Sequence, residues 1–469
     1  MTKLIKFVLV VLCLGSFMGT ALAAKTFTPA EKQQIATEYE TAQFISLAVA
    51  TCAGTYVPGG EAAEYSYLTD YGWKIRPYTL TNNGIEANFM VAYNNSKVTQ
   101  EHLYVLAFRG SASKQDWQVD LTTSRVIYGG HTLEEFVEVA KQSTEDKKAP
   151  KVHKGFNEYV RTALTLELDI NDDGVSEDLI ELLKTDKKTK LLITGHSLGG
   201  AAATLYAERL VSLGIPKEQV PVITFGAPAV GNAVFAQEYG DKINLLRIVT
   251  PYDPVPVGLQ ALIGGYQQFG PKKVLELSTK VADYQHPISF YFDLSLSNYY
   301  RVRDQAIAAG IIDKLPEQKI AGKEPLFAVM VGELKHISKI PYAPDIRRFI
   351  TNEYKNTFPR YVILDNTDNK YADATYGLEE LLAEAREAKA DYLLVAEIDG
   401  TRMGQENKWY IVMNQSVFNI DGGLVLMNSS GRRVTFESGI MQSAIHDVQK
   451  TQKELQQKFP WLSNRSFAN

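Results

Sequence analysis

The sequence is short of cysteine and of long apolar segments, and these two shortages exclude several classes of protein. Only Cys13 and Cys52 occur among 469 residues, which excludes a fold built on a network of disulfides. After the first 23 residues, no segment approaches the ~18 consecutive apolar residues of a membrane span. The formal net charge of −5 disfavours polyanions, so we do not expect nucleic acid as a partner.

The first 23 residues show the features of a secretory signal peptide in the usual order. Lys3 and Lys6 form a basic start, residues 7–17 are almost entirely apolar, and residues 21–23 (ALA) give the pattern that signal peptidase cleaves. We expect an exported protein, located in the periplasm or outside the cell. The alternatives are a retained membrane anchor and a lipoprotein attached at Cys13.

The pattern of apolar segments predicts an α/β protein with two domains. Between residues 190 and 249, short apolar segments alternate with helical ones, as in a mainly parallel sheet covered by helices. Residues 310–325 are rich in proline, glycine and charge, and we place a domain boundary there. We expect a first α/β domain over residues 24–310 and a smaller α/β domain over residues 325–469.

Two local signals predict individual elements near the start of the first domain. Thr28 is followed by proline and then by Glu31, which forms a capping box and predicts that a helix begins here. Residues 81–84 (TNNG) separate two apolar segments, 75–80 and 85–93, and predict a β-hairpin.

Residues 195–199 (GHSLG) form a G-x-S-x-G motif whose surroundings predict a catalytic serine. An apolar strand leads into the motif, and a helix rich in glycine and alanine follows it. Ser197 is expected on a sharp turn between the two, where the glycines admit close backbone approach. The amino terminus of the helix then directs its N–H groups at the reacting oxygen.

A serine nucleophile needs a base and an acid, which follow it along the chain in this class of fold. Asp253 comes directly after a predicted strand, at the end of a parallel strand where active-site residues lie. Three histidines follow Asp253. His286 is the preferred base, because His336 and His446 lie in the predicted second domain.

Several segments resemble, in the same order, the class 3 lipases, which are the fungal-lipase-like branch of the α/β-hydrolases. They are residues 105–111 (VLAFRGS), 152–156 (VHKGF), 194–201 (TGHSLGGA), 224–232 (TFGAPAVGN) and 253–256 (DPVP). The resemblance implies an α/β-hydrolase fold with Ser197, Asp253 and His286 as the catalytic triad. It also implies an oxyanion hole formed by the backbone N–H groups of Ser111 and Leu198, and structural roles for the motif histidines His153 and His196.

The resemblance implies hydrolysis of acylglycerols or related lipid esters through an acyl-enzyme, with transient contact with a lipid interface and no required cofactor. A phospholipase and a soluble carboxylesterase or feruloyl esterase share this mechanism and remain alternatives. The lid segment 112–118 is polar apart from Trp117, which weakens the case for strong interfacial activation. Extra residues between 124 and 150 are read as a solvated excursion that could rim the substrate pocket.

Residues 169–174 (DINDDG) match the opening of a calcium-binding loop. Asp169, Asn171 and Asp173 would be the oxygen ligands, and Gly174 would allow the sharp turn. The twelfth position is Ile180, where a glutamate is expected. A turn stabilised by Asx and glycine chemistry is therefore the alternative to a Ca²⁺ site.

Residues 388–398 (AKADYLLVAEI), followed by a long strand and a glycine turn, resemble the amino-terminal domain of TolB and related envelope modules. The resemblance implies that the second domain binds a protein partner in a bacterial envelope. A domain that merely shields or stabilises the hydrolase is one alternative. Another is that the whole chain is a binding module whose hydrolase site is vestigial.

Overall fold

The computed structural model describes fourteen stretches of the chain: residues 27–56, 72–82, 84–95, 102–110, 124–169, 174, 176–262, 264–275, 285–333, 343–366, 370–372, 376–403, 408–433 and 439–462. The predicted signal peptide, Ser111, the segment 112–118 and His336 lie outside these residues, as do Asn171 and Asp173 of the predicted calcium loop. Within the described stretches, no helix is both long and apolar enough to cross a membrane.

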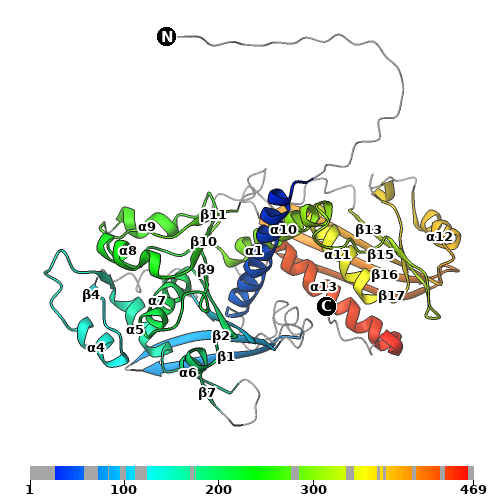
Figure 1. The fold of residues 1–469 in the computed structure, drawn as a ribbon. Helices are drawn as coiled ribbons and strands as arrows, with labels where there is room; N and C mark the ends of the chain where they lie inside the picture. The colour runs from blue at the N-terminus through cyan, green and yellow to red at the C-terminus, as the bar shows by residue number, and fades with distance from the viewer. Residues whose placement is uncertain are drawn as a thin grey trace, which may run out of the picture.

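The first sheet has seven strands in the order β1-β2-β3-β8-β9-β10-β11 and is mainly parallel (Figure 1). Three antiparallel strands open it, and the last four run parallel to the third. The bounds are β1 Lys74–Asn82, β2 Ile85–Asn95, β3 His102–Phe108, β8 Thr189–His196, β9 Val222–Phe225, β10 Leu245–Val249 and β11 Lys272–Val274. The predicted α/β class is thereby confirmed.

Helices cover both faces of this sheet. On one face, α1 (Pro29–Gly54) and α10 (Ile288–Ala308) share an apolar cluster with side chains of β3, β8 and β9. On the other face, α5 (Lys154–Ala163), α7 (Leu198–Ser212) and α8 (Ala233–Tyr239) pack in a second apolar cluster. Shorter elements complete this part: α6 Leu179–Thr185, α9 Val255–Leu262 and the 3-10 turn η2 Gly240–Lys242.

The two predicted local elements are present. Helix α1 begins at Pro29, and its capping box joins the Thr28 backbone N–H to Glu31 Oε2 at 2.8 Å and the Glu31 N–H to Thr28 Oγ1 at 3.2 Å. Strands β1 and β2 form the predicted hairpin and pair down to Asn82 opposite Ile85. Gly84 has a φ of +76°, which glycine adopts without strain.

The segment expected to be a solvated excursion is partly packed against the first domain, so that expectation was wrong for residues 126–128 and for Phe136. It forms β4 (Arg125–Ile127) and α4 (Leu133–Ala140), and β4 pairs with β5 (Lys151–His153). Tyr128 and Phe136 are buried, and their rings lie 3.6 and 3.9 Å from the guanidinium carbon of Arg209 on α7. Residues 131–135 and 141–148 are exposed throughout.

The second sheet has six strands in the order β12-β14-β13-β15-β16-β17, of which β14, β13 and β15 are parallel. Helices α11 (Ala343–Thr357) and α13 (Ile440–Lys458) cover one face, and α12 (Leu378–Glu387) covers the other. The strands are β12 Gln318–Lys319, β13 Phe327–Glu333, β14 Tyr361–Ile363, β15 Tyr392–Met403, β16 Lys408–Asn419 and β17 Leu424–Arg433, and the 3-10 turns are η4 Lys370–Ala372 and η5 Pro460–Leu462.

Helices α1, α10 and α13 lie between the two sheets (Figure 1). Helix α10 thereby joins the two parts of the fold. One continuous apolar cluster includes side chains of α1, α10, α11 and α13 and of both sheets. The carboxylate of Asp293 on α10 accepts hydrogen bonds from the N–H groups of Ile440 and Met441, at 2.8 and 3.0 Å, at the start of α13. The division into domains at residues 310–325 remains a prediction, since the core is shared across it.

Candidate active site

Ser197 lies on a strained turn between β8 and α7. Its φ of 58° and ψ of −127° place a non-glycine residue in the left-handed half of backbone space, which the surrounding structure must enforce. The serine N–H donates to the carbonyl oxygen of Phe225 on β9 at 2.9 Å. A Cβ at Gly195 would collide with the backbone of Gly199, and one at Gly199 with the backbone of Phe108. Both motif glycines are therefore required, because neighbouring backbone lies too close to them to leave room for a side chain.

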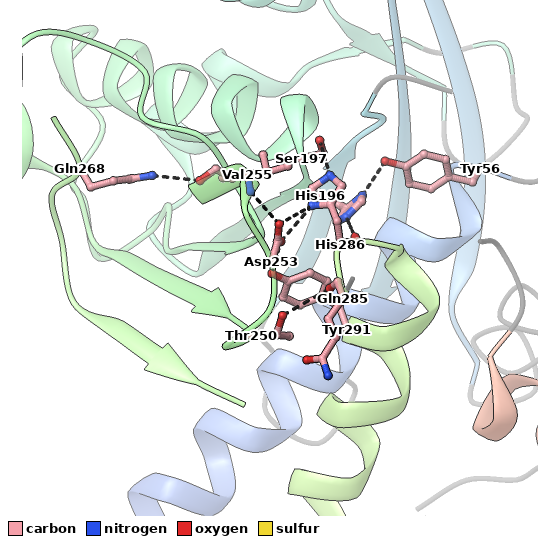
Figure 2. Close-up of polar contacts among 11 residues, drawn as sticks. Tyr56, His196, Ser197, Thr250, Asp253, Val255, Gln268, Gln285, His286 and Tyr291 are labelled. Carbon is pink, nitrogen blue, oxygen red and sulfur yellow. Dashed lines mark hydrogen bonds and ion pairs between the residues drawn. The ribbon is translucent and has the colours of Figure 1, made fainter. Parts of the chain in front are cut away.

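The structure brings together the three residues predicted as the triad (Figure 2). His286 Nε2 lies 2.9 Å from Ser197 Oγ, and His286 Nδ1 lies 3.0 and 2.9 Å from the two carboxylate oxygens of Asp253. All three residues are buried. This geometry lets the carboxylate hold the Nδ1–H tautomer, which leaves Nε2 to accept a proton from the serine.

Asp253 follows β10 and is held by donors on both of its oxygens. The N–H of Val255 donates to Oδ1 at 2.9 Å, and the hydroxyl of Tyr291 on α10 donates to Oδ2 at 2.6 Å. Gly226, with a φ of +57°, faces this carboxylate, and a Cβ there would stand 2.5 Å from Oδ2. These contacts satisfy the hydrogen-bonding capacity of the buried carboxylate and keep it aimed at His286.

A second chain of hydrogen bonds reaches His286 through the residue before the serine. His196 Nε2 lies 2.7 Å from the carbonyl oxygen of His286, and His196 Nδ1 lies 2.7 Å from the hydroxyl of Tyr56 at the end of α1. Burial, aided by the nearby His286, holds the pKa of His196 well below its ordinary value. The ring is therefore neutral, with Nε2–H donating to the carbonyl and Nδ1 accepting from Tyr56.

The predicted oxyanion donors are only partly within the described residues. Leu198 is the first residue of α7, so its N–H has no partner within the helix and points out of the helix start beside Ser197. Ser111 itself is not described, but Gly110 before it packs against the turn. A Cβ at Gly110 would stand 3.3 Å from the Cβ of Ser197. The backbone of Gly110 also hydrogen-bonds Tyr56.

The other predicted ligands and histidines lie away from this site. His153 is the N-cap of α5, where Nδ1 accepts from the N–H of Phe156 at 3.4 Å. His446 is on α13 of the second sheet. Asp169 follows β6 (Glu167–Leu168) and accepts from the N–H of Gly174, before β7 (Glu177–Asp178). The described residues contain no group of three or more His, Cys, Asp or Glu side chains arranged to hold a metal.

Sequence reasoning missed two groups that contact the triad and its support. Tyr291 lies five residues after His286 on a helix that was not predicted, and the only signal for it was the aromatic character of the segment. Tyr56 is distant along the chain from every motif, and no local pattern identifies it. Its role follows from the packing of α1 against β8.

Comparisons with known proteins find lipases and phospholipases. The family described as Lipase (class 3) matches residues 105–259. A phospholipase A1-II 1 of Oryza sativa is 32% identical over 161 residues, which is 32% of this chain and 38% of that protein. A secreted mono- and diacylglycerol lipase A of Penicillium cyclopium is 34% identical over 100 residues, or 21% of this chain and 32% of that protein. This chain thus spans less than half of the length of these relatives.

Among solved structures, the triacylglyceride lipase of Rhizomucor miehei is similar at 24% identity with a TM-score of 0.37, covering 54% of this chain and 82% of that one. The motif residues matched by the family include the strained serine turn and Asp253, both of which lie within residues 105–259. Residues 105–259 of this chain match the class 3 lipase family, which is of the α/β-hydrolase type.

Proposed function

We propose that this protein is a serine hydrolase that cleaves the carboxylic ester bonds of lipids through an acyl-enzyme. The observation that carries the proposal is the unbroken contact from Ser197 Oγ through His286 to Asp253. Each contact is within hydrogen-bonding distance, which is the geometry that general-base activation of a serine requires. The class 3 lipase match supplies the substrate class, since lipases act on lipid esters.

In the proposed acylation step, Ser197 Oγ attacks the ester carbonyl as its proton passes to His286 Nε2. Asp253 stabilises the resulting imidazolium through Nδ1–H, and the same proton then goes to the departing alcohol. Water, activated by the neutral His286, releases the carboxylic acid and restores the serine. Every proton in this cycle moves between protein, substrate and water, so no cofactor is required.

The proposed oxyanion hole combines the N–H of Leu198 with that of Ser111. The close packing of Gly110 against the serine turn supports the second donor, because it brings the start of that loop to the nucleophile. Losing one such donor typically costs ~2.7–4 kcal/mol of transition-state stabilisation. The link from Gly110 through Tyr56 and His196 to His286 supports a common positioning of donor and base.

The substrate is proposed to be a lipid acyl ester presented at an interface. Tyr252 and Val257 flank Asp253 and are 41% and 57% exposed, so apolar side chains reach solvent next to the site. Contact with a lipid surface would bury this apolar area. The phospholipase A1 relatives favour phospholipid as a second candidate substrate beside acylglycerols.

Export of the protein and a partner-binding second domain complete the proposal. The signal-peptide pattern of residues 1–23 supports export, as does a relative whose name describes it as secreted. We assign the proposed partner role to residues 325–469, because residues 388–398 and the strand and turn after them resemble TolB-type envelope modules.

A fluorophosphonate probe tests the catalytic proposal directly. The native protein should be labelled at Ser197 and lose activity in step, whereas Ser197→Ala should take up no label. His286→Ala should lower kcat by several orders of magnitude, while His446→Ala, a matched control on the second sheet, should leave it unchanged. Absence of labelling in the folded protein would refute the enzyme and favour a binding module with a vestigial site.

Substrate class is resolved by rates on three ester types with the same acyl chain: a diacylglycerol, a phosphatidylcholine and a water-soluble nitrophenyl ester. The proposal predicts higher kcat/KM for the two lipids above their solubility limits than for the soluble ester. Equal rates for all three would indicate a soluble carboxylesterase.

A further inference from the structure

A cavity of about 680 Å³ lies beside the second sheet and has no assigned role. Its walls come from α10, the segment after it, α11 and the ends of β13 and β14. The volume is within the range of small-molecule sites, ~300–1,000 Å³. None of the residues of the proposed active site lines it.

The topology of the second sheet places this cavity where α/β sheets usually bind ligands. The chain runs from β13 through α11 to β14 on one side, and then from β14 through α12 to β15 on the other side of β13. Helices α11 and α12 lie on opposite faces. The connections therefore diverge at the carboxyl ends of β13 and β14, which is a topological switch point with a crevice.

The strand pairing explains why the crevice is open. Strands β13 and β14 pair only as far as Val329 and Ile363, after which β13 continues to Glu333 against β15 alone. Val331 on β13 and Ile363 on β14 both line the cavity. Asn366 covers part of the exposed strand edge by donating to the carbonyl oxygen of Val331 at 3.2 Å. The floor of the cavity is thus apolar with a polar rim.

The charge of the lining is positive in a protein whose net charge is −5. Five cationic and three acidic side chains line it: Arg303, Lys314, Arg347, Arg348 and Lys355, with Asp304, Glu317 and Asp365. Cationic side chains outnumber acidic ones in the lining, and a crevice concentrates their electric field. The cavity therefore favours anionic ligands over cationic ones.

Asp304 and Glu317 of the lining are engaged in ion pairs. Arg348 pairs with Asp304 at 3.1 Å and with Asp345 at 2.6 Å, so its guanidinium is occupied. Lys314 and Lys355 share Glu317, each at 2.8 Å. The side chain of Arg303, by contrast, makes no ion pair or hydrogen bond with any residue in the described part of the chain. It is half-buried on α10, where its guanidinium is held in the wall of the cavity.

We propose that this cavity binds a small organic anion, with a phosphate or carboxylate group held by Arg303 and Arg347 and a short apolar part over Ile363. The guanidinium groups supply paired donors that match the geometry of an oxyanion. Burial of carbon atoms against the apolar floor is favourable, so organic anions should bind more tightly than bare inorganic ions. This site is independent of the proposed ester hydrolysis.

Isothermal titration of the full chain with defined probes tests the site. The probes are inorganic phosphate, glycerol 3-phosphate and hexanoate, with glycerol and hexanol as neutral counterparts, all at constant ionic strength. We expect the organic anions to bind, the neutral counterparts not to bind, and inorganic phosphate to bind more weakly than glycerol 3-phosphate. Comparison of glycerol 3-phosphate with hexanoate distinguishes a phosphorylated headgroup from a fatty carboxylate.

Variants separate this site from general anion effects. Arg303→Gln and Arg347→Gln should each weaken binding at least about tenfold, the loss expected for one charged hydrogen-bond donor, and Arg303→Glu should abolish it. Arg301→Gln, an exposed neighbour on the same helix, is the matched control and should bind as the native chain does. Circular dichroism checks that each variant is folded. Equal binding of anions and neutral counterparts, or unchanged binding in folded Arg303→Glu, would overturn the proposal.

Discussion

The hydroxyl of Tyr291 donates a 2.6 Å hydrogen bond to Oδ2 of Asp253, the carboxylate that also lies 2.9 Å from His286 Nδ1. Burial and the negative charge of Asp253 hold the pKa of Tyr291 well above its ordinary value, so the phenol stays protonated and remains a donor. Because Tyr291 is on α10, the helix that joins the two sheets also orients the proposed catalytic acid.

Replacement of Tyr291 by phenylalanine should slow catalysis without altering substrate binding. The ring stays in place, but the buried carboxylate loses one donor, and a hydrogen bond to a charged group contributes ~1.5–3 kcal/mol. We expect kcat on a soluble ester to fall roughly 10- to 100-fold with KM nearly constant. Tyr300→Phe, on the same helix and also buried, is the control. Unchanged kcat in Tyr291→Phe would mean that the other donors suffice to hold Asp253.

The neutral state of His196 should make the folded protein sensitive to mild acid. The folded-state pKa of His196 lies well below the ordinary value of 6.5, so the unfolded chain binds more protons between the two pKa values. Above about pH 6.5, His196 therefore does not lower the free energy of unfolding. Below that pH, the free energy of unfolding falls by ~1.4 kcal/mol per pH unit, because the unfolded chain binds this one extra proton. The free energy of unfolding, measured in urea between pH 5 and 7, should depend less steeply on pH in His196→Gln by about one proton. An identical pH dependence in the two proteins would contradict a neutral, buried His196.

Addition of a methyl group at Gly199 should disrupt the serine turn. Its Cβ would overlap the backbone of Phe108 on β3, which cannot move without disturbing the sheet. Gly199→Ala should lower the free energy of unfolding by about 1–3 kcal/mol, as overpacking does, and should lower activity as well. Gly258→Ala is the matched control, because its Cβ would meet no atom within 4 Å. Denaturant unfolding of both variants measures the difference in the free energy of unfolding. Equal values would contradict the prediction and show that β3 shifts to accommodate the methyl group.

The contact between Asp293 and α13 should stabilise both parts of the chain together. Asp293→Asn removes the negative charge that accepts from Ile440 and Met441 at the positive end of the helix. We expect a loss of ~1–3 kcal/mol in the free energy of unfolding, whereas the exposed Asp313→Asn should have little effect. Tryptophan fluorescence and circular dichroism should report one shared transition. Two separate transitions would show that the sheets unfold independently despite their common apolar cluster.

Removal of divalent cations should leave the hydrolytic rate unchanged, because the proposed proton transfers involve only Ser197, His286, Asp253, substrate and water. The measurement is kcat/KM on a soluble ester before and after EDTA and dialysis. The calcium-loop hypothesis is tested in the same samples through Tm. A rise in Tm with Ca²⁺ that Asp169→Asn abolishes would establish that site, and a rate that depends on Ca²⁺ would contradict a metal-independent mechanism.

Prediction from sequence succeeded where short-range patterns determine the structure. The capping box at Thr28 and the TNNG turn each involve a few neighbouring residues, so local propensity suffices. The serine turn was predictable because the G-x-S-x-G pattern is local, and Gly195 is needed for a backbone contact with Gly199 within the strand–turn–helix unit. Prediction failed for α10, whose residues 288–300 are buried on nearly all sides and therefore lack an amphipathic period.

The sequence by itself indicated the proposed nucleophile, the alternation of strands and helices and the order of the candidate triad residues Ser197, Asp253 and His286, because these follow from local periodicity and from motif order. Only the tertiary structure decided which groups support them. Tyr56 reaches His196 across 140 residues of chain, and Tyr291 reaches Asp253 from a helix that packs against both sheets. Such contacts depend on how distant elements pack, and packing is a property of the whole core, which no local pattern encodes.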